Sequence, residues 1–394
     1  MRRLLLLVAA IVFVDTMFYA VVAPLLPTFE EELGLSKASA GILMAAYPAG
    51  TLLGAVPSGL FAVRFGPRRA VLLGLALLGT SSIAFAVVDD VVLLDAARFV
   101  QGLGGACSWA GGLAWLIAEA PAERRGELIG AALGAAIGGG LFGPVLGAVA
   151  GALGTEPVFG AVAVVAAALA GWALATPAHD AGAAGAGAPL RDALRSRRVL
   201  AGMWLVALPA LGFGVLDTLA PLRMDDLGAS DAAVAAMFLV AAAVEALISP
   251  VIGRVSDRRG RLVPIRAGLL GAALMSLVVQ APEAALGVAA LLVVMTAALG
   301  TFWAPAMALL SDAAEASGVP QGLAFGLVNL AWALGMVTGA GAGGAVAEAT
   351  ADLVPYSAFA LLCAGTLVAV LRGADRADQG FDSTAVAAGS TMRP

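Results

Sequence analysis

The chain has 394 residues, of which 61% are hydrophobic and only 12% charged, with a formal net charge of −5. Soluble domains carry about 25% charged residues, so this is the composition of a membrane protein. The acidic balance excludes a nucleic-acid-binding protein, because no broad basic field exists to meet a phosphate backbone. One histidine, His179, cannot form a histidine metal cluster, and Cys107 and Cys363 lie in apolar runs where we expect packing residues rather than a disulfide scaffold.

Twelve apolar runs are each long enough to cross a bilayer as a helix, which takes about 20 residues. The first run follows Arg2 and Arg3 like a signal peptide. It is too long for one, contains Asp15 and has no small-residue cleavage site, so we expect it to stay in the protein. The runs cover residues 4–28, 38–62, 70–88, 92–118, 127–153, 157–176, 199–222, 230–252, 264–281, 284–310, 321–347 and 353–371.

The basic residues between these runs are distributed very unequally. Of the 22 lysines and arginines, only Lys37 and Arg223 fall in the segments opposite the N-terminal side, and Arg98 lies within a run. Basic residues concentrate in cytoplasmic loops, so the pattern predicts a multi-pass protein of the cell inner (cytoplasmic) membrane with both termini in the cytoplasm.

The longest connector, 177–198, divides the chain near its midpoint, and residues on its two sides recur at an almost constant offset. In the loop after the second and eighth runs, Gly59, Arg64 and Gly66 align with Gly253, Arg258 and Gly260. Such a repeat predicts a duplicated all-α membrane fold of two six-helix bundles. The expected divisions are an N-terminal bundle at 1–176, a cytoplasmic linker at 177–198, a C-terminal bundle at 199–371 and a disordered cytoplasmic tail at 372–394.

These two aligned loops combine glycines with charged residues. Glycine permits a tight turn against neighbouring helix ends, and the charges can lock or release two rocking halves. The loops resemble the signature loop of the major facilitator superfamily, although Val63 stands in the first copy where the family usually has an acid. The residues that carry this resemblance are Gly59, Arg64, Gly66 and Arg68 in the first copy and Gly253, Asp257, Arg258 and Gly260 in the second.

Two further runs carry motifs that resemble this family. Arg98 and Gln101 in the fourth run look like the arginine motif of proton-coupled members. An arginine inside a span costs about 2.5–3.5 kcal/mol to insert unless it is paired or faces water; a structural pair with Asp95, one turn earlier, is the alternative interpretation. The fifth run is similar to the motif of proton antiporters, which are exporters, and its small residues and proline favour close packing with a kink. Its residues are Gly139, Gly143, Pro144 and Gly147.

Asp15 and Thr16, followed by Pro24 and Pro27, look like the first helix of the twelve-span drug:proton antiporters and the related vesicular amine transporters. The resemblance extends over residues 4–371. It implies the major facilitator fold and an alternating-access transporter, whose substrate pocket lies near the membrane midplane and is lined mainly by helices 1, 4, 7 and 10.

Asp15, Arg98, Asp217 and Glu245 are the ionisable residues deepest in the runs and the candidates for proton coupling. A carboxyl group that moves between aqueous and dehydrated surroundings changes its proton affinity, as coupling requires. We expect Asp15 to bind either a proton or a cationic aromatic substrate; a structural role beside Arg98, with Glu245 as the proton site, is the alternative. Trp115 and Trp332 are lesser candidates for the pocket wall. The candidate substrate-binding residues are Asp15, Phe18, Tyr19, Gln101, Trp109, Phe213, Asp217, Trp303 and Asn329.

The leading function is a monomeric antiporter that exports small amphipathic or cationic compounds in exchange for protons. A proton-coupled exporter of a specific metabolite, such as a sugar or an amino acid, is the alternative, but the expected cavity helices have few Asn or Gln side chains for such cargo. A non-transporting membrane sensor is a third possibility. An enzyme is not expected, since no nucleophile with a histidine base, metal site or phosphate loop occurs. The expected partners are the substrate, protons and the lipid bilayer, with no cofactor, metal or nucleic acid.

Overall fold

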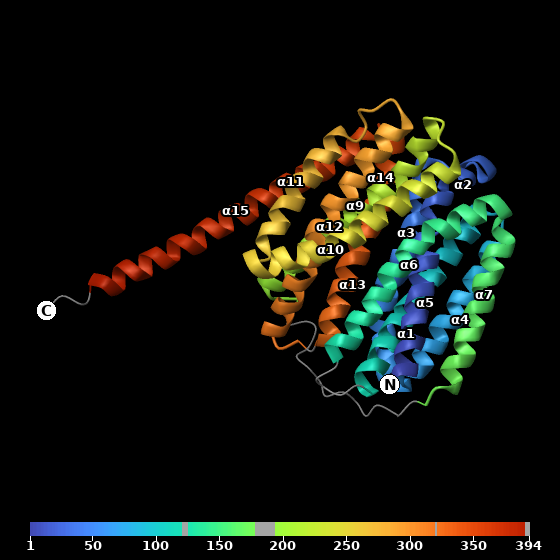
Figure 1. The fold of residues 1–394 in the computed structure, drawn as a ribbon, viewed down its shortest axis with the longest axis horizontal. Helices are drawn as coiled ribbons and strands as arrows, with labels where there is room; N and C mark the ends of the chain where they lie inside the picture. Colours follow the sequence, from blue (N-terminus) through green and yellow to red (C-terminus); the bar gives the residue numbers. More distant parts are fainter. Residues whose placement is uncertain (120–124, 178–193, 320, 391–394) are drawn as a thin grey trace.

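The computed structural model describes residues 1–119, 125–177, 194–319 and 321–390. Within these ranges the chain forms helices and short connections and no strand (Figure 1). Ten helical segments are long and apolar enough to cross a membrane, and α11 (Leu262–Val278) is a shorter apolar helix. The helix α5 (Val91–Glu119), which contains Asp95 and Arg98, packs alongside α3 and α4. The all-α membrane fold predicted from the sequence is confirmed.

The first half of the chain, residues 1–177, packs around one hydrophobic core in which Phe18, Phe85 and Phe159 are fully or almost fully buried. Pro24 and Pro27 interrupt the first span, because proline lacks the N–H that continues a helix. In chain order the other elements are α1 (Arg2–Ala20), η1 (Ala23–Leu25), α2 (Leu26–Leu33), α3 (Lys37–Phe65), α4 (Pro67–Val87), α6 (Arg125–Leu153) and α7 (Thr155–Ala175).

The second half, residues 194–390, has its own hydrophobic core. It repeats local features of the first. The Ser36 hydroxyl accepts a hydrogen bond from Ser39 N at the start of α3, in the first half. The Ser230 hydroxyl accepts one from Ala233 N at the start of α10, in the second half, and each bond is 3.3 Å long. Besides α11, the elements are α9 (Arg197–Asp226), α10 (Asp231–Arg259), α12 (Ala285–Ala316), α13 (Gln321–Val337), the π-helical turn η3 (Thr338–Ala342), α14 (Gly343–Ala349) and α15 (Leu353–Ser390).

Glycines make the same helix contact in both halves. In the first half, α6 lies against α1 so closely that a Cβ on Gly143 would be 3.0 Å from Met17 O and one on Gly147 would be 3.0 Å from Val21 O. Gly139 meets the Phe13 carbonyl oxygen even more closely. In the second half α13, η3 and α14 approach α9 through glycines at the aligned positions, which are Gly335, Gly339 and Gly343. The small-residue face expected in the fifth run therefore packs against a helix backbone.

The last helix, α15, continues to Ser390 and extends beyond the bundle (Figure 1). The tail expected at 372–394 begins within this helix, and its disorder stays a prediction. The extension requires no new helix nucleation, because the segment follows directly from a formed helix and contains several alanines, which favour the helix. The linker at 177–198 lies mostly outside the described residues.

Polar contacts join the two halves at one end of the molecule, which we call the Lys37 end. Lys37 Nζ forms a 2.7 Å ion pair with Asp352 Oδ1, and Ala38 N donates a hydrogen bond of 2.8 Å to Glu348 Oε2. Here α3 crosses α14 at two glycines, so that a Cβ on Gly41 would lie 3.2 Å from the Cα atom of the second glycine, Gly344. The halves are thus held together at the Lys37 end. The other end carries the arginine loops after α3 and α10 and is called the arginine-rich end.

Replacing Lys37 with Met is expected to favour separation of the halves at the Lys37 end about fivefold, since a partly exposed ion pair is worth up to about 1 kcal/mol. Spin labels on cysteines placed at the exposed positions Glu32 and Thr350 would measure the distance between the halves. The two native cysteines, Cys107 and Cys363, are buried and leave these labels specific. Lys37→Arg keeps the charge and serves as the control. An unchanged distance distribution in Lys37→Met would show that the pair does not hold this end closed.

Candidate functional site

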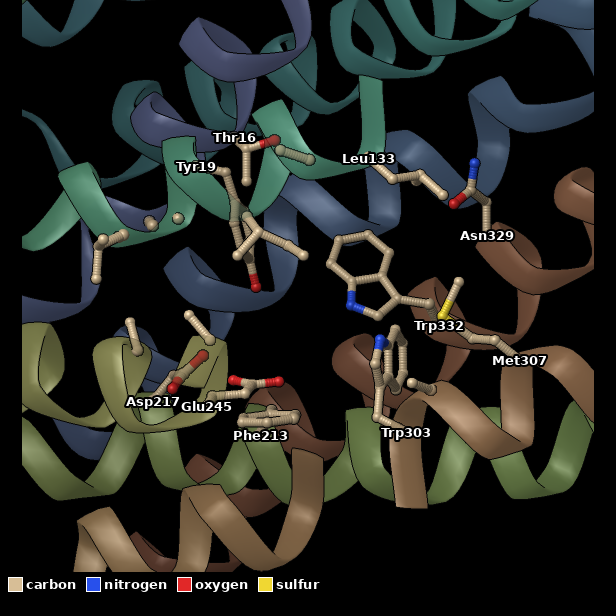
Figure 2. Close-up of a pocket in the computed structure, with 18 of the residues that line it drawn as sticks. Thr16, Tyr19, Leu133, Phe213, Asp217, Glu245, Trp303, Met307, Asn329 and Trp332 are labelled. Carbon is tan, nitrogen blue, oxygen red and sulfur yellow. The ribbon is translucent and has the colours of Figure 1, made fainter. Parts of the chain in front are cut away.

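A cavity of about 780 Å³ lies between the two halves, within the range typical of small-molecule sites. Its wall is formed by α1, α3, α5 and α6 from the first half and by α9, α10, α12 and α13 from the second. The side chains are mainly apolar and aromatic, with a few polar groups among them. Figure 2 labels Thr16, Tyr19, Leu133, Phe213, Asp217, Glu245, Trp303, Met307, Asn329 and Trp332 around this space.

Two carboxylates face the cavity from the second half. Asp217 on α9 and Glu245 on α10 lie side by side, with Phe213 next to them (Figure 2). They are close enough to interact electrostatically. Across the part of the chain that the structure describes, neither carboxylate has a hydrogen bond or an ion pair. Gly300 on α12 makes room for the Glu245 side chain, since a Cβ at position 300 would be 3.0 Å from Glu245 Oε1. Among the described residues, neither of the two acids in the cavity thus has a counterion.

An aromatic cluster forms the opposite wall. Tyr19 on α1 and Tyr47 on α3 lie with ring centroids 4.8 Å apart. Trp332 on α13 meets both rings edge-on, at 5.7 Å from Tyr19 and 6.4 Å from Tyr47, so this cluster connects the two halves at the cavity. Trp109 on α5 extends the wall. These rings offer flat faces for an aromatic ligand and attract cations.

Asp15 lies behind this wall and is not a lining residue. Only 1% of its surface is exposed. Tyr47 Oη donates a hydrogen bond of 2.9 Å to Asp15 Oδ2, and Trp109 Nε1 donates one of 3.2 Å to the same oxygen. The other oxygen, Oδ1, is buried and has no hydrogen-bond partner among the residues that the structure describes. Two aromatic side chains, Tyr47 and Trp109, therefore stand between Asp15 and the cavity.

Arg98 is also fully buried behind the wall. Its guanidinium donates to Gln101 Oε1 at 2.6 Å and to Tyr19 O at 3.3 Å. It lies 5.2 Å from the Tyr47 ring centroid and 5.6 Å from that of Tyr19, in the range of cation–π contacts. Arg98 does not form the alternative pair with Asp95, whose Oδ1 is buried without a hydrogen-bond partner in the described part of the chain. The tyrosine rings and Gln101 stabilise this charge instead.

The candidate binding residues fall into three groups. Gln101 lies with Asp15 and Arg98 behind the wall. Phe18 is elsewhere: its ring packs 5.7 Å from Phe85 and 5.3 Å from Phe159 in the core. Phe18 and Tyr19 follow Asp15 by three and four residues and so point about 100° apart on the helix, and only Tyr19 points into the cavity. The candidates that line the cavity are Tyr19, Trp109, Phe213, Asp217, Glu245, Trp303 and Asn329.

The sequence did not single out Tyr47, which touches Asp15, Arg98 and Trp332 at once. A tyrosine near the middle of an apolar span was the available signal. Trp332, a lesser candidate, lines the cavity, whereas Trp115 is fully buried in the core of the first half.

The signature loops close helices at the arginine-rich end. Gly66 after α3 and Gly260 after α10 have φ values of 92° and 87°, which favour glycine. Gly59 and Gly253 lie inside α3 and α10, and a Cβ on either would meet nothing within 4 Å, so the expected close approach to a neighbouring helix does not occur at them. The remaining loop residues, Arg64, Arg68, Asp257 and Arg258, lie in or next to the same helix ends.

Comparisons with known proteins agree with this architecture. The family model described as Major Facilitator Superfamily matches residues 8–323 and 210–394. A "Chloramphenicol resistance protein" of Streptomyces lividans is 31% identical over 359 residues, which cover 88% of this chain and 89% of that protein. Two further relatives match over about a quarter of their own length. The "4-hydroxybenzoate transporter PcaK" of Pseudomonas putida is 40% identical over 103 residues, which cover 26% of this chain and 23% of that protein. The "Probable vesicular acetylcholine transporter-B" of Danio rerio is 35% identical over 124 residues, which cover 29% of this chain and 25% of that protein. The chain therefore belongs to the major facilitator superfamily of membrane transporters.

Proposed function

We propose that the protein is a proton-coupled antiporter that exports small amphipathic or cationic compounds by alternating access. The observation that carries the proposal is the pair Asp217 and Glu245, which face an apolar, aromatic cavity without a counterion among the described residues. A charged carboxylate away from bulk water favours a compensating cation. A proton and the cationic group of a cargo molecule can each fill that role, so they compete for the same acids.

The other cavity walls suit the rest of such a cargo. Trp303 and Trp332 lie near each other in Figure 2 and offer ring faces to an aromatic body. Asn329 adds a single amide group on α13. Five Ser and Thr hydroxyls also line the cavity, but those of Thr16, Thr51 and Ser249 donate to carbonyl oxygens of their own helices. The rest of the wall is mainly apolar and aromatic, which favours apolar over sugar-like cargo. The relatives named for chloramphenicol resistance and for acetylcholine transport support this class of substrate.

The buried cluster behind the tyrosine wall supplies a second proton site in this proposal. Asp15 exchanges its proton as the halves rearrange, and Arg98 adjusts the charge around it. The two six-helix bundles, 1–176 and 199–371, rock about the cavity, with the arginine-rich end in the cytoplasm and the protein in the inner membrane as a monomer. Closure at the Lys37 end then corresponds to a state whose cavity opens toward the cytoplasm.

The experiment that tests the function uses protein in liposomes with a pH-sensitive dye inside and an imposed proton gradient. Lipophilic cations, neutral drugs, sugars and amino acids are added in turn. Proton movement driven by lipophilic cations or drugs is the expected result. Proton movement with sugars or amino acids alone would replace the proposed cargo by a defined metabolite. No proton movement with any compound would contradict proton-coupled export of these classes.

In the same assay, Asp15→Asn is expected to abolish substrate-driven proton movement while the protein stays folded. The amide keeps the shape and can still accept a hydrogen bond from Tyr47, but it cannot bind and release a proton. The thermal unfolding midpoint and cargo binding would show that the fold and the cavity persist. Undiminished proton movement in Asp15→Asn would remove Asp15 from the coupling mechanism.

A further inference from the structure

Asp15 can exchange a proton with the cavity only across the side chains that cover it. Tyr47 and Trp109 both line the cavity, and both donate a hydrogen bond to Asp15 Oδ2. Gly105, which also lines the cavity, lies against the carboxylate with a bare Cα: a Cβ there would lie 3.1 and 3.2 Å from the two carboxylate oxygens. The structure therefore offers two candidate bridges between Asp15 and the cavity.

The two bridges differ in chemistry. The indole of Trp109 has a donor N–H and no acceptor, so it can hold a carboxylate in place but cannot take up a second proton. The phenol of Tyr47 is both donor and acceptor. Its oxygen can therefore accept a proton from cavity water while its own proton moves to Asp15. Of the two side chains that donate to Asp15, only Tyr47 has both groups needed to pass a proton through the wall.

Close packing fixes the position of Tyr47. A Cβ on Gly105 would be 2.5 Å from Tyr47 Oη, so the absence of a side chain at 105 leaves the space that the hydroxyl occupies. Gly102 lies directly against the Tyr47 carbonyl oxygen, and Thr51 Oγ1 donates to that same oxygen at 3.2 Å. The hydroxyl is thus held at hydrogen-bond distance from Asp15 by α5 on one side and by its own helix on the other.

We propose that Tyr47 is the proton relay between the cavity and Asp15. A hydronium ion in the cavity gives a proton to Tyr47 Oη and becomes water as the phenolic proton moves to Asp15 Oδ2, so that the phenol is regenerated and the carboxylate becomes a carboxylic acid. Release follows the reverse path. The titratable and charged groups facing Asp15 are Tyr47 from α3 and Arg98 from α5. Tyr19, on α1 itself, contacts Arg98. Residues 130–153 of α6 and 157–175 of α7 contain no titratable side chain.

This relay deepens the proposed function and rests on it for its role in transport, but its test does not require a cargo. The reconstituted full-length protein is subjected to a rapid pH jump without substrate, and the infrared C=O band of protonated Asp15 is followed with time. The band is identified by its loss in Asp15→Asn. A positioned proton-transferring group contributes typically about 10²–10⁴-fold to a rate, so Tyr47→Phe should slow the appearance of the band about 100-fold.

Tyr356→Phe is the matched control. It removes one phenolic oxygen from another buried tyrosine, whose hydroxyl has no hydrogen-bond partner, and it should leave the rate unchanged. Gly105→Ala keeps the Tyr47 hydroxyl but displaces it from Asp15, and should slow the exchange as Tyr47→Phe does. If Tyr47→Phe exchanges protons at the wild-type rate, or if Asp15 gives no such band at any pH, the relay is overturned.

The failure of the relay and the failure of the proposed function give different results. A relay without transport would show Tyr47-dependent proton exchange at Asp15 and no cargo-driven proton movement in liposomes. Transport without the relay would show cargo-driven proton movement in the wild type and an unchanged infrared rate in Tyr47→Phe.

Discussion

Glu245→Gln is expected to weaken binding of a lipophilic monocation, such as tetraphenylphosphonium, by about tenfold or more. The side chain lines the cavity with its carboxylate unpaired, so a bound cation would be its direct counterion. A close pair of opposite charges in a desolvated contact is worth about 1.5 kcal/mol or more, and 1.4 kcal/mol corresponds to a tenfold change in affinity. Asp217→Asn should have a similar effect. Binding to the purified protein at fixed pH, measured by equilibrium dialysis, tests both variants.

A neutral drug of similar size provides the comparison ligand, because its affinity should change little when a carboxylate becomes an amide. Glu156→Gln is the matched control variant: it removes one negative charge at an exposed position at the start of α7, outside the cavity. Effects of Asp217→Asn and Glu245→Gln should not add, since the two acids interact with each other. Equal cation affinity in the wild type and both cavity variants would show that neither acid binds the cation.

Gly139→Ala is expected to lower the free energy of unfolding by about 1–3 kcal/mol, the usual cost of overpacking a close contact. Gly139 lies against the Phe13 carbonyl oxygen, so the new methyl group meets rigid backbone rather than a movable side chain. To accept it, α6 and α1 must separate. A lower midpoint of thermal unfolding and a lower yield of folded protein in detergent would be the measured result.

Gly134→Ala on the same helix controls for the change of residue itself. A Cβ at Gly134 meets nothing within 4 Å, and alanine favours a helix over glycine by about 1 kcal/mol. This variant should therefore be as stable as the wild type or more so. If both variants unfold at the same temperature, the contact between α6 and α1 is less tight than the structure indicates.

Local patterns in the sequence predicted the features that depend on them. Apolar runs gave the spans, and the spacing of Gly139, Gly143 and Gly147 indicated a smooth helix face, which packs on α1. Deep charges marked Asp217 and Glu245, and both line the cavity. A charged residue inside an apolar run and a glycine at regular helical spacing can both be recognised in the sequence itself, because the first is costly to bury and the second lacks a side chain.

Contacts between distant helices could not be predicted in the same way. Helical geometry placed Phe18 and Tyr19 on the same face of the first helix as Asp15, but which of the two side chains points into the cavity depends on how α1 rotates against α4, α6 and α7. The position of Arg98 likewise depends on α3, because Tyr47 supplies the ring that covers it. Residues that meet across helices leave no signal in the spacing of one span.

Lys37 is the single lysine in the chain, and its side chain carries the ion pair at the closed end. The unmodified protein thus contains its own chemical reporter: an amine-directed reagent should acylate Lys37 faster whenever the halves separate and the ammonium group leaves Asp352. The N-terminal amine lies at the opposite end of the molecule (Figure 1) and gives an internal reference for reagent and time. Turnover could then be followed by mass spectrometry in native membranes, without any engineered label.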